Sequence, residues 1–247
     1  MNITINPDYI RLKSFVEGIP ESFDHSGKLI YDKRNKVRLF EVDGEKVVVK
    51  RYKVPMIFQR VDYSYFRPSK AKRAYLYALT LETLDIKTPA PIAYIEDTSE
   101  GIFRQGYFVS AYTGHPSLKD HREELISDPV LFDAYVDFLV EMHDKGFMHG
   151  DQNLSNILFW EEGDDYRFEV IDINRSHFIS DPSREDCLRN LMRISRDREF
   201  SHKVVERYAE MRGWDKSASV SFVDKQIDKY ERKRKMRKFY HKVFPKK

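Results

Sequence analysis

The chain contains a single cysteine, Cys187, among its 247 residues. One cysteine excludes an intrachain disulfide and any metal site that needs several thiolates. This usage favours the reducing cytoplasm as the compartment. Cys187 lies in a stretch with helical character, Glu185 to Leu191, so we interpret it as a buried packing thiol rather than a nucleophile.

Long apolar runs and low-complexity tracts are absent as well. No run of about 18 apolar residues exists, so we expect no membrane-spanning helix. The first residues, Met1 to Asp8, lack the basic start and apolar stretch of a signal peptide. With 41% hydrophobic and 34% charged residues, the chain is expected to form one large domain or two packed lobes. We expect a cytoplasmic protein that can still associate peripherally with the inner face of the cytoplasmic membrane.

The net charge of +3 hides a strong division along the chain. Residues 225–247 contain eleven Lys or Arg and two Asp or Glu, a local charge of +9 that leaves −6 for the rest. Such a basic C-terminal helix or tail suits an anionic partner: a phospholipid surface, lipid A or nucleic acid. Phe239, Tyr240, Val243 and Phe244 interleave with the basic residues and favour a membrane surface. A solvated helix with a frayed end is an equally open alternative.

The first part of the chain has the pattern of strands and one helix. Residues 36–42 and 45–52 alternate around Asp43-Gly44, which predicts a β-hairpin with a type I′ turn. Ser69 is the expected N-cap of a helix over residues 70–84. Two further strands are expected at residues 92–95 and 106–112.

The remainder is mostly helical in pattern. Asp128-Pro129 opens a predicted helix over residues 130–144, two short strands follow near 157–159 and 168–171, and everything after about Asp181 is helical. This order predicts an α+β protein with two lobes. Its expected parts are an antiparallel-sheet N-lobe at 1–110, a mostly helical C-lobe at 111–224 and the basic helix or tail at 225–247.

Candidate catalytic residues lie in the run His149-Gly150-Asp151, followed by Asn156. A loop carboxylate can accept a proton from a substrate hydroxyl, and an amide oxygen five residues later can hold a metal that bridges phosphates. Asp172 ends an apolar strand sixteen residues after Asn156, where a second metal ligand is needed. The alternative for Asp151 and Asn156 in isolation is that they only cap turns.

Lys50 stands at the end of the predicted strand Val47 to Lys50. A lysine there can pair with the α- and β-phosphates of a nucleotide. Alone it is typical of an exposed edge-strand residue. Its order relative to the helix, the linker near 110–114 and the later carboxylates makes coincidence a poor explanation.

These residues together resemble the protein-kinase-like superfamily over about residues 28 to 215. Three segments within that span resemble the lipopolysaccharide kinase (Kdo/WaaP) family: Ser69 to Tyr75, Ile86 to Ala93 and Ile171 to Arg175. The resemblance implies a bilobal kinase-like fold with ATP and Mg²⁺ as cofactors. The resemblance implies that Asp151 is the catalytic base and that Asn156 and Asp172 are Mg²⁺ ligands in the nucleotide site. It implies that Lys50 contacts the α- and β-phosphates and that backbone groups around Ser110 to Tyr112 meet the adenine. It also implies that His149 is a structural brace of the loop and that Arg175 contacts substrate or orders its segment. A surface salt bridge is the open alternative for Arg175.

Two features depart from the superfamily pattern. The predicted loop Tyr31 to Lys36 contains no glycine, although its basic residues could supply charge to the phosphates. No glutamate is visible on the predicted helix to pair with Lys50: the expected place is near Leu76, and Glu82 lies almost two turns later. An inactive or catalytically weak kinase-fold protein that binds nucleotide or lipid is therefore an alternative.

The acceptor is expected to be a small molecule. Gly150 stands where protein kinases usually carry an arginine, and the stretch from Asp172 to Arg184 is short with no Ala-Pro-Glu after it. From the resemblance we expect a monomeric, ATP-dependent kinase that acts on a Kdo or heptose hydroxyl of the lipopolysaccharide inner core. Its expected partner is the lipopolysaccharide core or a lipid A precursor. Kinases of another small molecule or of a protein remain alternatives, and nucleic acid is the least favoured partner because only charge supports it.

Overall fold

A computed structural model describes residues 1–243. Residues 244–247 of the predicted basic tail, Phe244 among them, lie outside the described residues, as do the side chains of Tyr240 and Val243. The chain divides into two compact units. The first comprises Met1–Gly114 and Glu169–Arg175, and the second comprises His115–Phe168 and the described residues from Ser176 onward.

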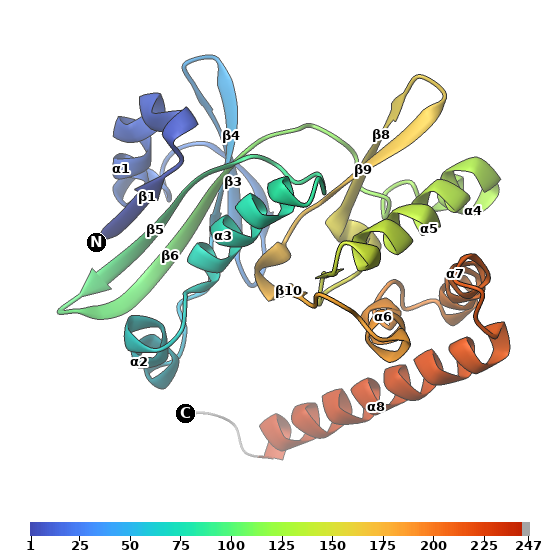
Figure 1. The fold of residues 1–247 in the computed structure, drawn as a ribbon. Coiled ribbons are helices and arrows are strands. Elements are labelled where there is room, and N and C mark those ends of the chain that lie inside the picture. Colours follow the sequence, from blue (N-terminus) through green and yellow to red (C-terminus); the bar gives the residue numbers. More distant parts are fainter. Residues whose placement is uncertain (244–247) are drawn as a thin grey trace. The chain divides into compact units, whose positions relative to one another are not determined.

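The first unit is built on a six-stranded antiparallel sheet with the order β1-β5-β6-β4-β3-β2 (Figure 1). Its strands are β1 (Asn2–Ile5), β2 (Lys28–Asp32), β3 (Lys36–Val42), β4 (Glu45–Arg51), β5 (Pro91–Ser99) and β6 (Ile102–Ala111). The predicted hairpin is confirmed as β3–β4. Asp43 and Gly44 have φ angles of 52° and 80°, and positive φ at both positions is what a type I′ turn requires.

Alternation along β4 places its side chains on two faces of the sheet. Val47 and Val49 are buried on the face covered by helix α1 (Lys13–Ser22), which follows the 3₁₀ helix η1 (Pro7–Leu12). The opposite face packs against α3 (Lys70–Thr83) through a cluster of four buried side chains: Tyr52, Ala71, Tyr75 and Tyr94. Lys50 has the same strand parity as Tyr52, so it lies on the face that α3 covers.

Helix α3 begins as the sequence predicts. The Ser69 side chain accepts a hydrogen bond from the backbone N–H of Lys72 at 3.1 Å, which satisfies one of the open donors of the first turn. Between β4 and α3 the chain forms a further helix, α2 (Ile57–Tyr65), which lies beside β6. Helices α1 and α2 had no counterpart among the sequence-based expectations.

The second unit is mostly helical, and the predicted helix over 130–144 is confirmed as α5. Its helices are α4 (Arg122–Ser127), α5 (Pro129–Asp144), α6 (Arg184–Leu191), α7 (Arg198–Met211) and α8 (Lys216–Val243). Short antiparallel pairs join β7 (Phe147–Met148) to β10 (His177–Phe178) and β8 (Ile157–Glu162) to β9 (Asp165–Val170). The core combines buried residues of α5 and α7, among them Leu139 and Val205. Cys187 is buried in α6, as expected, and burial raises the pKa of its thiol.

Helix α8 carries the basic C-terminal sequence. Val223 and Ile227 are buried on its first half, whereas every side chain from Asp228 to Arg237 is exposed. Arg198 of α7 pairs with Asp224 at 3.0 Å and with Asp228 at 2.6 Å. These ion pairs neutralise acidic side chains of α8, so the exposed part of the helix presents a surface of predominantly positive charge.

Candidate active site

Lys50 projects from β4 into a partly closed environment within the first unit. Its Nζ forms an ion pair with Asp172 Oδ1 at 2.6 Å, and the same nitrogen lies 5.4 Å from the centre of the Tyr52 ring. The Lys50 side chain is 15% exposed and that of Asp172 is 34% exposed. Solvent screens the attraction in this pair less than in a surface pair, and the contact orients the lysine side chain.

Asp172 belongs to a short segment, Glu169–Arg175, that is attached to the first unit. The backbone of Val170 is held at both ends: its N–H donates to the carbonyl of Lys87 at 2.9 Å, and its carbonyl accepts from Thr88 Oγ1 at 2.8 Å. Thr113 Oγ1 donates to Glu169, and Asn174 Nδ2 donates to Asp172. The missing glutamate partner of Lys50 is thus replaced by a carboxylate from this segment.

The backbone of Asp172 is left-handed, with a φ of 59°. Aspartate tolerates this region better than most residues, but it still costs energy that the surrounding contacts must offset. Strained backbone of this kind concentrates at sites where a side chain has to point in a specified direction. Here it accompanies a carboxylate aimed at Lys50.

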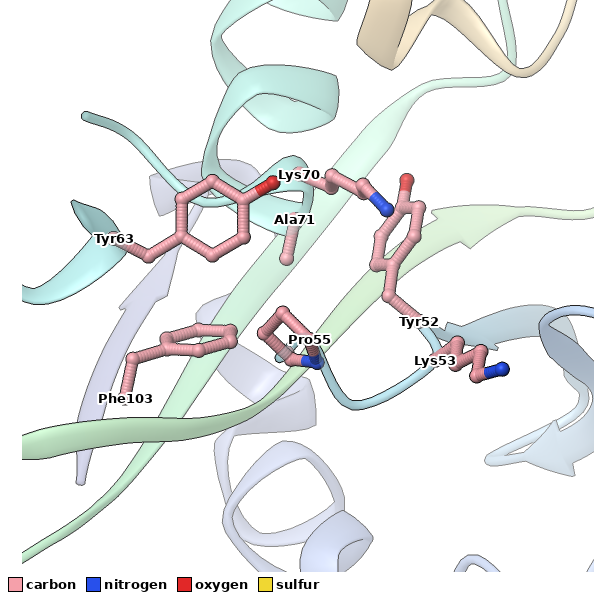
Figure 2. A pocket seen from close by; sticks show the side chains of 8 residues that line it. Tyr52, Lys53, Pro55, Tyr63, Lys70, Ala71 and Phe103 are labelled. Atoms are coloured by element: carbon pink, nitrogen blue, oxygen red, sulfur yellow. The ribbon is translucent and has the colours of Figure 1, made fainter. Parts of the chain in front are cut away.

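A cluster of cations lies around Lys70, the first residue of α3. Lys70 is half-buried, and burial, followed by the charges of Arg34, Arg175 and Arg73, lowers its pKa from 10.5 to about 8. Lys70 also lines a small pocket, with its side chain extending from the start of α3 toward Tyr52 (Figure 2). Burial disfavours the charged form of Lys70, and the neighbouring positive charges disfavour it further. Several cations held together in this way form an arrangement that binds anions. Arg34 comes from the glycine-free loop between β2 and β3, so this loop does bring charge to the cluster.

The strand end predicted to meet adenine is occupied by backbone hydrogen bonds. The N–H of Ala111 donates to the carbonyl of Ala90 at 2.9 Å, and that of Tyr112 donates to the carbonyl of Lys46 at 3.0 Å. Ser110 is buried, whereas Tyr112 is exposed. The backbone N–H groups of Ala111 and Tyr112 are therefore bonded to backbone carbonyls of the first unit. The assignment of this backbone to adenine stays a prediction.

The loop after β7 in the second unit holds His149, Asp151 and Asn156. His149 is fully buried; its carbonyl accepts from Ser176 Oγ at 3.0 Å, and its Nδ1 accepts from the Asp151 N–H at 3.3 Å. Asn153 contacts both the carbonyl and the carboxylate of Asp151, at 3.1 and 3.3 Å. These contacts give the loop a defined shape around Asp151.

Asn156 is oriented by the same loop. Its Nδ2 donates to the Asp151 carbonyl at 2.9 Å, and no described residue donates to its Oδ1. The amide oxygen of Asn156 and the carboxylate of Asp172 are hard donors of the type that Mg²⁺ prefers, with phosphates and water completing its shell. Each of these two groups therefore suits this metal by its chemistry. Within the described part of the chain, no group of three or more His, Cys, Asp or Glu side chains is arranged to hold a metal alone.

Sequence reasoning missed Arg193, which follows α6. Its Nη2 forms an ion pair with Asp151 Oδ1 at 2.9 Å, and its Nη1 donates to the Gly150 carbonyl at 3.4 Å. The guanidinium also lies 5.3 Å from the centre of the Tyr230 ring of α8. An arginine thus contacts Asp151 from a position more than 40 residues downstream of the loop, where no local pattern announces it.

A buried hydrogen-bond chain also reaches the loop. The Gly150 N–H donates to Asn190 Oδ1 at 3.1 Å, and Asn190 Nδ2 lies 2.9 Å from His143 Nε2. His143 Nδ1 lies 2.8 Å from the Tyr208 hydroxyl. Burial, with the charge of Arg212 adding to it, lowers the pKa of His143 from 6.5 to about 3, so this histidine is neutral. Buried polar networks whose members are all paired fix one geometry.

The structure thus brings the expected residues together as two sets, one in each unit. Lys50 and Asp172 form one set, and Asp151 and Asn156 form the other. Arg175 lies in the 3₁₀ helix η3 (Ile173–Arg175) of the first unit, and its side chain is exposed. No helix among the described residues is long and apolar enough to cross a membrane.

Comparison with known proteins gives a family and a fold. The model of the lipopolysaccharide kinase (Kdo/WaaP) family matches residues 33–211, a span that includes both sets and Arg193. A search of curated proteins found no match. Among solved structures, WaaP in complex with acyl carrier protein is similar, with a TM-score of 0.62 and 16% identity over 93% of this chain and 99% of that chain. This likeness confirms the predicted α+β kinase-like fold.

Proposed function

The chain belongs to the lipopolysaccharide kinase (Kdo/WaaP) family, and from this premise we propose that it phosphorylates a Kdo or heptose hydroxyl of the lipopolysaccharide inner core. Membership makes it a phosphotransferase whose phosphoryl donor is ATP. The choice of sugar, the metal and the residue roles are the proposed part.

The Lys50–Asp172 ion pair, with its 2.6 Å separation, is the observation that carries the proposal. Phosphoryl transfer needs little covalent chemistry from the protein; it needs cations on the phosphates and a carboxylate on the metal. Lys50 and Asp172 supply one of each at the same place. The cationic cluster around Lys70 adds charge where a triphosphate requires it.

In the proposed reaction the acceptor hydroxyl oxygen attacks the γ-phosphorus while the bond from that phosphorus to the β–γ bridging oxygen breaks. ADP leaves, and the hydroxyl proton passes to the carboxylate of Asp151. Arg193 and Asn153 hold that carboxylate, with the Arg193 contact at 2.9 Å. Asn156 and Asp172 are the residues that would hold Mg²⁺, and the ion would offset negative charge on the phosphates.

The exposed basic part of α8 supports an acceptor that lies at a membrane surface. A core lipid precursor is anionic and membrane-anchored, and basic side chains near an anionic surface contribute about 1 kcal/mol each when well placed. The exposed stretch Asp228 to Arg237 contains six basic residues and two acidic ones. We therefore assign α8 to the surface that carries the substrate.

Incubation of the chain with Kdo-terminated and heptose-containing core lipids, labelled ATP and Mg²⁺ tests the proposal, with product mass identifying the sugar. Asp151→Asn and Asp172→Asn should each reduce transfer by about 10³-fold. Asp164→Asn, at an exposed hairpin turn, is the matched control and should retain full activity. Transfer that survives either active-site change would remove that residue from its role. Thermal stabilisation by Mg-ATP without transfer to any acceptor would instead indicate a nucleotide-binding protein.

A further inference from the structure

Exposed apolar side chains are concentrated around α2 in the first unit. Six of the nineteen strongly exposed large apolar side chains in the described part of the chain fall within residues 54–66. They are Val54, Met56, Phe58, Val61, Tyr65 and Phe66, and we call them the α2 apolar face. Contiguous exposed apolar surface of this kind marks an interaction site, whereas single exposed apolar residues are ordinary.

Helix α2 directs Arg60, Tyr63 and Ser64 toward the protein. Arg60 Nε donates to the carbonyl of Phe103 at 2.7 Å, and the Phe103 N–H donates to Ser64 Oγ at 2.7 Å. The Tyr63 ring packs edge-on against Phe103, with 5.5 Å between ring centres. These contacts attach α2 to β6, beside which it lies in Figure 1.

The outward stripe of α2 is apolar. Phe58, Val61 and Tyr65 follow one another at helical spacing of three and four residues, so they share one side of the helix. Phe58 is 65% exposed and Tyr65 66%, and the following residue, Phe66, is 78% exposed. The usual pattern of a surface helix, with its apolar stripe toward the core, is therefore reversed.

The surroundings of this face are basic. Residues 53–73 contain six Lys or Arg and a single acidic residue, Asp62. Lys53 precedes α2 and Arg67 follows it, and both are exposed. Aromatic and aliphatic side chains between cations are the composition of helices that lie in the interface of an anionic bilayer.

We propose that the α2 apolar face is a membrane-contacting element that inserts into the surface of an anionic lipid bilayer. A lipid surface fits better than a protein groove because the apolar stripe is short, exposed and flanked by cations. The inference rests on the proposed function, since a lipid-anchored acceptor gives the enzyme a reason to meet a bilayer. It adds a second contact, distinct from the charged surface of α8.

Vesicle binding by the full chain tests the inference. The probe is a vesicle of phosphatidylethanolamine with about one quarter phosphatidylglycerol, at low salt and at about 0.5 M NaCl, where surface electrostatics are screened. The variant Phe58→Gln/Tyr65→Gln should lose at least about tenfold in vesicle affinity, and the loss should persist at high salt because apolar insertion is not screened. Ile10→Gln/Val130→Gln is the matched control, since these residues are 61% and 62% exposed, and it should bind like the unmodified chain.

A direct insertion measurement covers the case in which the double variant misfolds. In Phe58→Trp, the added tryptophan should give fluorescence that brominated lipids quench. The unmodified chain, with Trp160 and Trp214 in the second unit, gives the baseline for that quenching. No additional quenching, or unchanged vesicle affinity of a folded double variant, overturns the proposal. So does a change in oligomeric state without a change in vesicle binding, which would make the face a contact between copies.

The two proposals fail in different ways. With a delipidated core oligosaccharide as acceptor, the double variant should transfer phosphate at the unmodified rate. With vesicle-embedded acceptor its rate should fall in parallel with binding. Absence of transfer to either acceptor by the unmodified chain would contradict the proposed function while leaving the vesicle result to decide on α2.

Discussion

Lys50 and Asp172, separated by 122 residues in sequence, meet with 2.6 Å between Nζ and Oδ1. In protein kinases the corresponding lysine pairs with a glutamate of the helix that follows it. Here α3 offers Leu76 near that position, and its side chain is 41% exposed. The lysine is therefore anchored by the proposed metal-binding carboxylate itself. When a nucleotide binds, either Lys50 and Asp172 must separate, or Lys50 must contact the phosphates while it stays paired with Asp172.

This pairing predicts opposite effects of Lys50→Met on two ligands. ATP affinity should fall by about tenfold or more, because a charge-assisted contact to phosphate contributes about 1.5–3 kcal/mol. Affinity for Mn²⁺ alone should rise, because Asp172 loses a competing cation. Isothermal titration measures the first and electron spin resonance the second. Lys46→Met, at an exposed position of β4, should change neither, and a loss of metal affinity in Lys50→Met would contradict this account.

Lys70 predicts a pH-dependent stability. Its pKa in the folded protein is about 8, below the ordinary 10.5, so between these values the unfolded chain holds more protons than the folded one. The free energy of unfolding should therefore rise with pH across that window. Lys70→Gln should be more stable than the unmodified chain at pH 7, and this difference should shrink toward zero near pH 10.5. Denaturant titrations from pH 7 to 10 measure it. Lys28→Gln, an exposed control, should leave the pH dependence unchanged; a pH-independent Lys70→Gln difference would refute the shift.

Arg193 should act on turnover more than on ATP binding. Its guanidinium holds the Asp151 carboxylate at 2.9 Å, and Arg193→Met would leave that side chain free to rotate. We expect kcat to fall by about 10- to 100-fold with the KM for ATP nearly unchanged. Arg193→Lys should restore part of the loss, since it keeps the charge without the planar fork. Arg189→Met, which removes an exposed pair with Asp186, is the control. An equal fall in kcat for Arg193→Met and Arg189→Met would point to general destabilisation.

Much of the fold was predictable because its signals are local. The β3–β4 hairpin has its turn pair, Asp43 and Gly44, and both adopt the positive φ that the pair favours. Helices α3 and α5 begin with side-chain caps at Ser69 and Asp128. In each case the residues that specify the element lie within or beside it, so a short window of sequence contains the information.

What could not be predicted depends on contacts between distant segments. Arg193 reaches Asp151 and Asn190 reaches Gly150 only because α6 packs near the loop. Helix α2 has an apolar pattern, but nothing in it reveals that the apolar stripe faces outward; the hydrogen bonds of Arg60 and Ser64 with Phe103 decide that. The sequence marks Asp172 as a candidate metal ligand, but no local pattern shows that it pairs with Lys50.

His143 predicts a second pH dependence, with its own window. Its folded pKa is about 3 against an ordinary 6.5, so as pH falls below 6.5 the unfolded chain takes up a proton that the folded chain does not. Stability should be lost at up to about 1.4 kcal/mol per pH unit over that range. In His143→Gln that slope should be absent, although the variant is less stable at pH 7. His25→Gln, at an exposed residue, should keep the slope. Parallel pH profiles for the unmodified chain and His143→Gln would contradict the prediction.

The last prediction concerns the glycine that precedes β7 and the loop holding Asp151. Gly146 has a φ of 75°, and a Cβ there would lie 2.3 Å from the carbonyl oxygen of Ile179. Gly163 has a similar φ of 66° with no atom within 4 Å. Alanine at either position incurs the left-handed backbone cost of about 1–2 kcal/mol, but only Gly146→Ala must also displace the backbone of Ile179, which follows β10.

We therefore expect Gly163→Ala to lower the free energy of unfolding by about 1 kcal/mol and Gly146→Ala by about 3 kcal/mol or more. The displaced Ile179 donates its N–H to the Gly146 carbonyl at 2.9 Å, next to the β7–β10 pair. Because β7 leads directly into His149, Gly146→Ala should also lower phosphate transfer in the fraction that remains folded, and Gly163→Ala should not. Equal destabilisation of the two variants would show that the chain around Ile179 yields to the added methyl group, and the close approach would then not constrain the loop.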